Sequence, residues 1–187
     1  MKRAGKVAIG ATLITAIAVF GALQTVSAPA NETVTSLPAS ETPPAVQTGS
    51  CAYMWAYKDA PELTVSFDSA VKALNAEASG RAEYYGEDCI YADGSATFST
   101  METDFYTRLP VDDLSKEDEF GNWVAQVMEI VTQIPRENLP GNYGFVEFSF
   151  EKTEAERIIF RVPIQQYISD AQGKSGAELL RLFYSPP

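Results

Sequence analysis

The capacity of this chain to fold lies almost entirely after residue 50. Twenty of its 21 aromatic residues and both of its cysteines fall in residues 51–187. Residues 31–50 contain three prolines, no aromatic residue and no apolar periodicity. Such a segment cannot bury enough surface to offset its chain entropy. We therefore predict a Pro/Thr/Ser-rich linker over residues 31–50 and a single folded domain over residues 51–187.

Residues 1–30 show the three-part pattern of a secretory signal peptide. Basic residues begin it, an uncharged and mostly apolar run follows over residues 7–23, and Ala28-Pro29-Ala30 offers a cleavage site before Asn31. The run has 17 residues, at the short edge of what spans a bilayer. Residues 1–30 are therefore either a cleaved signal peptide or an N-terminal membrane anchor. Both alternatives predict an exported domain, secreted or periplasmic in one case and tethered outside the cytoplasmic membrane by residues 7–23 in the other.

The composition excludes several classes of function. The chain has no histidine, so it can carry neither a Ser-His-Asp or Cys-His triad nor an imidazole metal site. After residue 30 it has 11 basic and 25 acidic residues, a net charge of −14, which argues against a nucleic-acid partner. Two cysteines are too few for a four-thiolate zinc or iron–sulfur site. We predict no cofactor, no metal site and no nucleic-acid partner.

Cys51 and Cys89 are the only cysteines of the chain. In an exported protein a disulfide is the default, and the chain-entropy model gives about 3–4 kcal/mol for a loop of this size. The alternative is one buried and one reactive free thiol. Cys51 lies far beyond the apolar run and follows Thr48-Gly49-Ser50, so we reject a lipidation site there.

Hydrophobic periodicity predicts the order helix, hairpin, helix, hairpin, helix. The expected elements are a helix capped by Asp59 with apolar residues from Leu63 to Leu74, strands over 81–91 and 96–109 joined by Asp93-Gly94, a helix from Ser115 to Pro135, strands over 146–150 and 158–164, and a short helix capped by Ser175. This order predicts a two-layer α+β domain with a mostly antiparallel four-stranded sheet and its helices on one face (α-β-β-α-β-β-α).

Two short segments carry a resemblance to known proteins. Gly86-Glu87-Asp88-Cys89 and Met101-Glu102-Thr103-Asp104-Phe105-Tyr106 resemble a group of small exported bacterial α+β proteins of unknown function. The order of elements is similar over roughly residues 58–185. The resemblance implies an exported α+β domain and no activity, cofactor or catalytic residue. Members of that group often look like lipoproteins, and this chain departs from them in that respect.

The second predicted strand carries the candidate binding residues. Side chains two apart on a strand share a face, so we expect Phe98, Glu102, Asp104, Tyr106 and Arg108 to lie together. Glu102 and Asp104 could form an acid–base pair for a glycoside, or Arg108 could simply pair with them. The other aromatic residues of the strands (Tyr84, Tyr85, Tyr91, Tyr143 and Phe145) cannot all fit on one buried face with Phe98 and Tyr106. Exposed rings can stack on sugars or dock a protein.

An acidic cluster surrounds the start of the second predicted helix. It comprises Asp112, Asp113, Glu117, Asp118 and Glu119. Carboxylates can hold calcium, but the helix dipole also favours acids at an N-terminus, and the chain has no Asp-x-Asp-x-Asp-Gly loop. We therefore assign no metal site there.

These observations favour a non-catalytic binding or interaction module of the cell envelope or extracellular space. Its partner is an unknown protein or carbohydrate, and it meets a membrane only through its N-terminal segment. Two alternatives stay open: a carboxylate-dependent hydrolase of envelope polysaccharide that uses Glu102 and Asp104, and an inhibitor of an extracellular enzyme.

Overall fold

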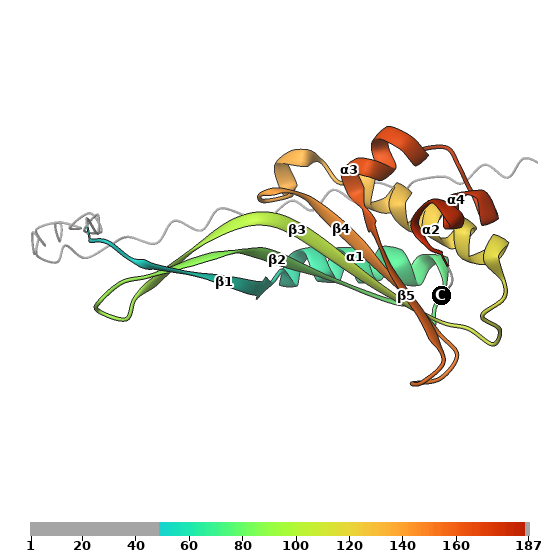
Figure 1. Ribbon diagram of the computed structural model, residues 1–187, viewed down its shortest axis with the longest axis horizontal. Helices are drawn as coiled ribbons and strands as arrows, with labels where there is room; N and C mark the ends of the chain where they lie inside the picture. Colours follow the sequence, from blue (N-terminus) through green and yellow to red (C-terminus); the bar gives the residue numbers. More distant parts are fainter. Residues whose placement is uncertain (1–48, 186–187) are drawn as a thin grey trace, which may run out of the picture. The chain divides into compact units, whose positions relative to one another are not determined.

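A computed structural model describes residues 49–185, which form one α+β unit built on a five-stranded sheet (Figure 1). The elements are β1 (Ala52–Asp59), α1 (Pro61–Leu74), β2 (Ser79–Ile90), β3 (Ala96–Pro110), α2 (Glu117–Thr132), η1 (Arg136–Asn138), β4 (Asn142–Glu151), β5 (Arg157–Pro163), α3 (Ile164–Gln166), η2 (Tyr167–Ala171) and α4 (Gly176–Phe183). The predicted signal or anchor segment and nearly all of the predicted linker lie outside the described residues. Within residues 49–185 no helix has both the length and the apolar character needed to cross a bilayer.

The sheet has five strands in the order β1-β2-β3-β4-β5, so the predicted count of four was wrong. The missing strand is β1, which pairs antiparallel with β2. Its sequence is apolar or aromatic at consecutive positions from Ala52 to Tyr57, without polar alternation. Nearly all of β1 is exposed on both faces, so burial imposes no period of two on its residues.

The α+β class and the two predicted hairpins are confirmed. β2 pairs with β3 and β4 pairs with β5, both antiparallel. β3 and β4 run parallel, because α2 carries the chain back across the sheet between them. The sheet is therefore mixed, with three antiparallel pairs and one parallel pair.

The helices share one face of this sheet. Phe67 of α1 meets Phe105 of β3 edge-to-face at 4.9 Å, and Phe120 of α2 stacks on Phe150 of β4 at 4.2 Å. Phe105 and Phe150 point to the same side, since Leu109 is four residues beyond Phe105 and pairs with Phe150. All of these rings are buried in one continuous core, and α4 packs on α2. In the part of the chain that the structure describes, no helix packs on the opposite face of the sheet, which is called the open face below (Figure 1).

A β-bulge divides β3 into two halves with opposite facing. Tyr85 pairs with Glu102, but the next residue, Gly86, pairs with Thr100, so Met101 is extra in β3. An extra residue shifts the alternation of side chains by one. In β3, the even-numbered side chains before Met101 therefore point to the helix-bearing side of the sheet. The even-numbered side chains after Met101 point to the open face.

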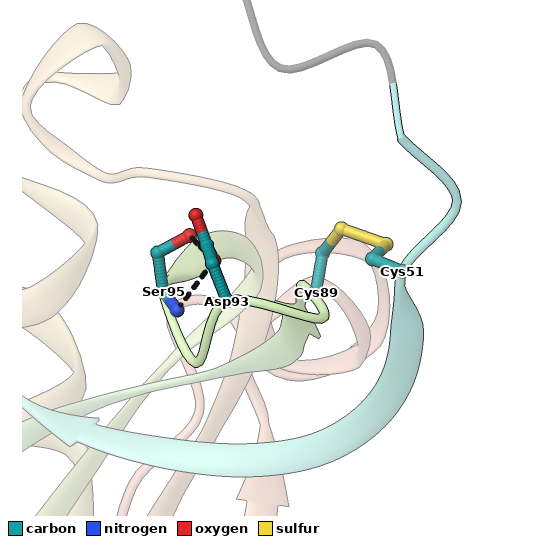
Figure 2. Close-up of a disulfide and its surroundings, with 4 residues drawn as sticks. All are labelled: Cys51, Cys89, Asp93 and Ser95. Carbon is teal, nitrogen blue, oxygen red and sulfur yellow. Dashed lines mark hydrogen bonds between the residues drawn. A yellow bond between two sulfur atoms is a disulfide. The ribbon is translucent and has the colours of Figure 1, made fainter.

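The half of the β1-β2-β3 sheet that carries the β2–β3 turn extends beyond the helices (Figure 1). A disulfide joins Cys51, just before β1, to Cys89 near the end of β2, as predicted (Figure 2). In the neighbouring turn, Asp93 accepts hydrogen bonds from the amide and the hydroxyl of Ser95. The disulfide thus fixes the start of β1 to β2 where no helix supports it.

Candidate functional site

Three aromatic side chains form a continuous row on the open face. Trp55 stacks on Tyr85 with 5.6 Å between ring centres and 15° between planes, and Tyr57 is tilted against Tyr85 at 5.0 Å. We call Trp55, Tyr57 and Tyr85 the ring row. Trp55 and Tyr57 are 58% and 59% exposed, which is unusual for large rings that have neighbours to pack on.

Two carboxylates flank the ring row. Glu87 pairs in register with Trp55, and Glu102 pairs in register with Tyr85, so both point to the open face beside the rings. Both side chains are partly exposed. Neither forms an ion pair with any lysine or arginine of residues 49–185. Exposed π-faces beside carboxylates that lack a protein cation form a site suited to a positively charged group.

The other half of the open face is neutralised by internal ion pairs. The guanidinium of Arg81 lies 3.8 Å from the ring centre of Tyr106 and pairs with Glu83. Similar pairs join Arg161 to Glu147, with the Arg161 guanidinium 4.1 Å from the Phe145 ring, and Arg108 to Glu151. Arg81 and Arg161 thus each contact an aromatic ring and a carboxylate, and Arg108 pairs with a carboxylate. Among residues 49–185, no lysine or arginine forms a cation–π contact with a ring of the ring row.

Asp104 is a structural residue of the open face. Its side chain is 1% exposed, and its Oδ1 accepts a hydrogen bond of 3.1 Å from the backbone N–H of Phe145. The β3–β4 register shifts at this point, and Asp104 stands opposite the irregularity. Burial is the main cause that raises the pKa of this carboxyl to about 6, and the charges of Glu102 and Glu83 add to it. The carboxyl therefore accepts a backbone hydrogen bond where the β3–β4 register shifts. Because it is buried, a large substrate cannot reach it.

Four of the five predicted binding residues lie together, and the fifth does not. Glu102, Asp104, Tyr106 and Arg108 all follow the bulge and belong to the open face. Phe98 precedes the bulge and pairs with Asp88 on the helix-bearing side, where the Lys58 amine lies 5.3 Å from its ring centre. The expected common face fails at Phe98 because simple alternation does not anticipate an extra residue.

Sequence reasoning missed the most exposed part of the site, Trp55 and Tyr57. Both lie on β1, the strand that was not predicted. The available signal was the alternation Tyr53, Trp55, Tyr57 directly after Cys51, since aromatic residues with a spacing of two are typical of strands.

Depressions elsewhere on the surface are not centred on the ring row. One of about 450 Å³ lies between the ends of α1 and β3 and the start of α2, next to Asp112 and Glu119. Another, of about 370 Å³, is lined by Arg81, Tyr106 and Arg108. In the acidic cluster Lys116 pairs with both Asp112 and Glu119. In residues 49–185 no group of three or more Asp, Glu, Cys or His side chains is placed to hold a metal ion.

The comparisons with known proteins found no similar protein. No family model, curated protein or solved structure matches the chain. Any proposal for its function therefore depends on the residues and geometry described above.

Proposed function

We propose that this protein is an exported, non-catalytic binding module that recognises a positively charged partner with the ring row and the carboxylates beside it. The observation that carries the proposal is the position of Glu87 and Glu102, which flank Trp55 and Tyr85 without a protein cation. A lysine, arginine or quaternary ammonium group held over an aromatic face gains about 0.5–2 kcal/mol of binding free energy. At the ring row the same group would lie next to Glu87 and Glu102, which would serve as its counter-ions.

The charge of the whole exported chain supports the same partner. Residues 31–187 carry 25 acidic and 11 basic side chains, a net charge of −14. A field of this sign speeds the encounter with a basic partner and repels an acidic one. Export is part of the proposal: the disulfide between Cys51 and Cys89 supports it, because such bonds persist in oxidising compartments.

A neutral carbohydrate is the second candidate ligand, because exposed tryptophan and tyrosine rings also stack on sugar faces. An inhibitor of an extracellular enzyme would be a special case of the same binding role. The geometry offers no support for a hydrolase built on Glu102 and Asp104, since the Asp104 carboxyl is buried and bonded to the Phe145 amide.

Calorimetric titration of the exported protein with hexalysine, hexaglutamate and cellohexaose tests the proposal. We expect hexalysine alone to bind, and the double variant E87Q/E102Q to bind it about fivefold or more weakly at low salt. Trp55→Ala should weaken binding as well. The matched control E137Q/E154Q removes two exposed carboxylates elsewhere and should bind hexalysine almost as wild type does.

Two results would overturn this assignment. Equal loss of affinity in E87Q/E102Q and E137Q/E154Q would mean that only net charge attracts the peptide. Binding of cellohexaose that persists in E87Q/E102Q and disappears in Trp55→Ala would make the ligand a carbohydrate.

A further inference from the structure

Among the residues that the structure describes, no strand pairs with the outer edge of β1. β1 lies at the end of the sheet order, and its register with β2 runs without a break over all eight residues. Proteins usually protect a sheet edge with proline, a bulge, charged side chains or a short strand. β1 has no proline and no bulge, and its two charged residues, Lys58 and Asp59, stand together at its end. Tyr53 and Met54 at its other end are 72% and 56% exposed.

The backbone groups that point to the free edge belong to residues whose side chains lie on the open face. The N–H of Ala60 donates to the carbonyl oxygen of Ala82, at 3.3 Å, which is the next step of the β1–β2 register. In an antiparallel ladder every second residue is bonded to the neighbour strand. Ala56 and Lys58 are therefore bonded to β2, and the N–H and C=O groups of Tyr53, Trp55 and Tyr57 point outward.

We infer that the free edge of β1 binds an extended basic segment of a partner protein as an added strand. This inference rests on the proposed function and names the form of the cationic partner. A strand beside β1 would form hydrogen bonds with the backbone of Tyr53, Trp55 and Tyr57. Its alternate side chains would stand about 4.5–5.5 Å from those of Trp55 and Tyr57, so that lysine or arginine would lie over the exposed rings.

Charge complementarity favours a basic partner over a second copy of this chain. β1 itself is neutral, with one lysine and one aspartate, while residues 31–187 carry a net charge of −14. Pairing two copies through β1 would bring two like net charges together and would leave Glu87 and Glu102 without counter-ions. A basic segment supplies counter-ions at the same place where it completes the ladder.

Amide hydrogen exchange of the isotope-labelled exported protein tests the inference with two peptides. One is Ac-Thr-Lys-Val-Lys-Val-Lys-Thr-amide, and the other has the same sequence with N-methyl groups on its five central residues. The second peptide keeps the charge and side chains but loses the donors that a strand needs. We expect the first peptide to slow exchange at Tyr53, Trp55 and Tyr57 by about tenfold or more, since each amide gains a hydrogen bond.

The experiment contains its own control amides, and its outcomes distinguish failure of strand addition from failure of the cation site. Ala56 and Lys58 are already bonded to β2, so their exchange should not change, and the N-methylated peptide should bind about tenfold more weakly. Equal binding of both peptides would overturn strand addition and leave the cation site of the proposed function intact. Protection of the three amides without peptide, together with a doubled mass in light scattering, would assign the edge to a second copy and overturn the inference. Failure of both peptides to bind would overturn the inference and the proposed function together.

Discussion

Asp104 shows how one buried acid shapes the open face. Its carboxyl accepts the N–H of Phe145, which the shifted β3–β4 register would leave without a strand partner. The site is tightly packed around this carboxyl: a Cβ at Gly144 would stand 1.8 Å from Asp104 Oδ1, so only glycine fits there. The same enclosure raises the pKa of the carboxyl to about 6, because burial disfavours its charged form.

Asp104→Asn should change how stability depends on pH. The pKa of Asp104 is raised from 3.8 to about 6, so the folded protein holds this proton more tightly than the unfolded chain does. The contribution of this bound proton to the free energy of unfolding is fully present below pH 4 and is lost as the pH rises to about 6. The stability of wild type relative to Asp104→Asn should therefore fall by about 2–3 kcal/mol between pH 4 and pH 7.

Urea unfolding of both proteins across this pH range measures that difference. Comparing the two proteins cancels the opposite contributions of acids with lowered pKa values, such as Asp68, whose pKa is lowered first by its hydrogen bond with Lys72. A difference that stays constant from pH 4 to pH 7 would show that Asp104 titrates normally.

The individual side chains of the candidate site were predictable only as far as strand alternation holds. Glu102, Asp104, Tyr106 and Arg108 were placed together correctly, because they follow one another without interruption after the bulge. Phe98 was misplaced by the extra residue at Met101. The small residue that allows the bulge is visible in the sequence as Gly86, where a Cβ would stand 2.1 Å from the Ser99 carbonyl oxygen. A lone glycine in a strand does not reveal which partner residue is extra.

At the scale of elements, the disulfide supplies a covalent attachment for β1, which has little buried surface to hold it in place. β1 has little buried surface, and its end near Cys51 belongs to the part of the sheet that no helix covers. A bond between Cys51 and Cys89 holds that end in register with β2.

Replacing both cysteines by serine should therefore affect β1 more than the rest of the fold. The chain-entropy model gives a loss of about 3–4 kcal/mol for a loop of this length, seen as a lower urea midpoint. Hydrogen exchange at Ala56 and Lys58 should accelerate more than exchange in α2. Unchanged exchange in β1 would mean that its ladder with β2 is stable without the disulfide.

The elements themselves were predictable where one face is buried. The stripe that includes Phe67 and Val71 indicated α1, and both hairpins follow from alternation around turn residues. The parallel β3–β4 pair follows from the helix that separates the two hairpins. β1 was not predicted because both of its faces are exposed, so no burial pattern marks it. Trp55 and Tyr57, which lie on β1, were missed for the same reason.

At the scale of the whole molecule, the proposal of export rests on the N-terminal sequence and the disulfide, and the proposal of a basic partner rests on net charge. Residues 7–23 are apolar, all 25 acids follow residue 30, and the domain holds a disulfide. Under the proposed function, an acidic domain of this kind would meet its basic partner outside the cytoplasm.

The intact mass of the native protein, measured without reducing agent, distinguishes a cleaved signal peptide from an N-terminal anchor. We expect a chain that begins at Asn31 and is lighter by two hydrogens, because Cys51 and Cys89 are paired. A mass that retains residues 1–30 would identify a membrane-tethered protein, whose partner must then lie within reach of the linker.

The most direct test of the binding face uses the two tryptophans of the chain as reporters. Trp55 is exposed in the ring row, and Trp123 is a buried residue of α2, on the helix-bearing side of the sheet. In a two-dimensional ¹H–¹⁵N spectrum each gives one indole N–H signal. On titration with hexalysine, we predict that the Trp55 signal moves with saturation while the Trp123 signal stays in place. Saturable binding that leaves the Trp55 signal unmoved would contradict the assignment of the ring row as the binding site.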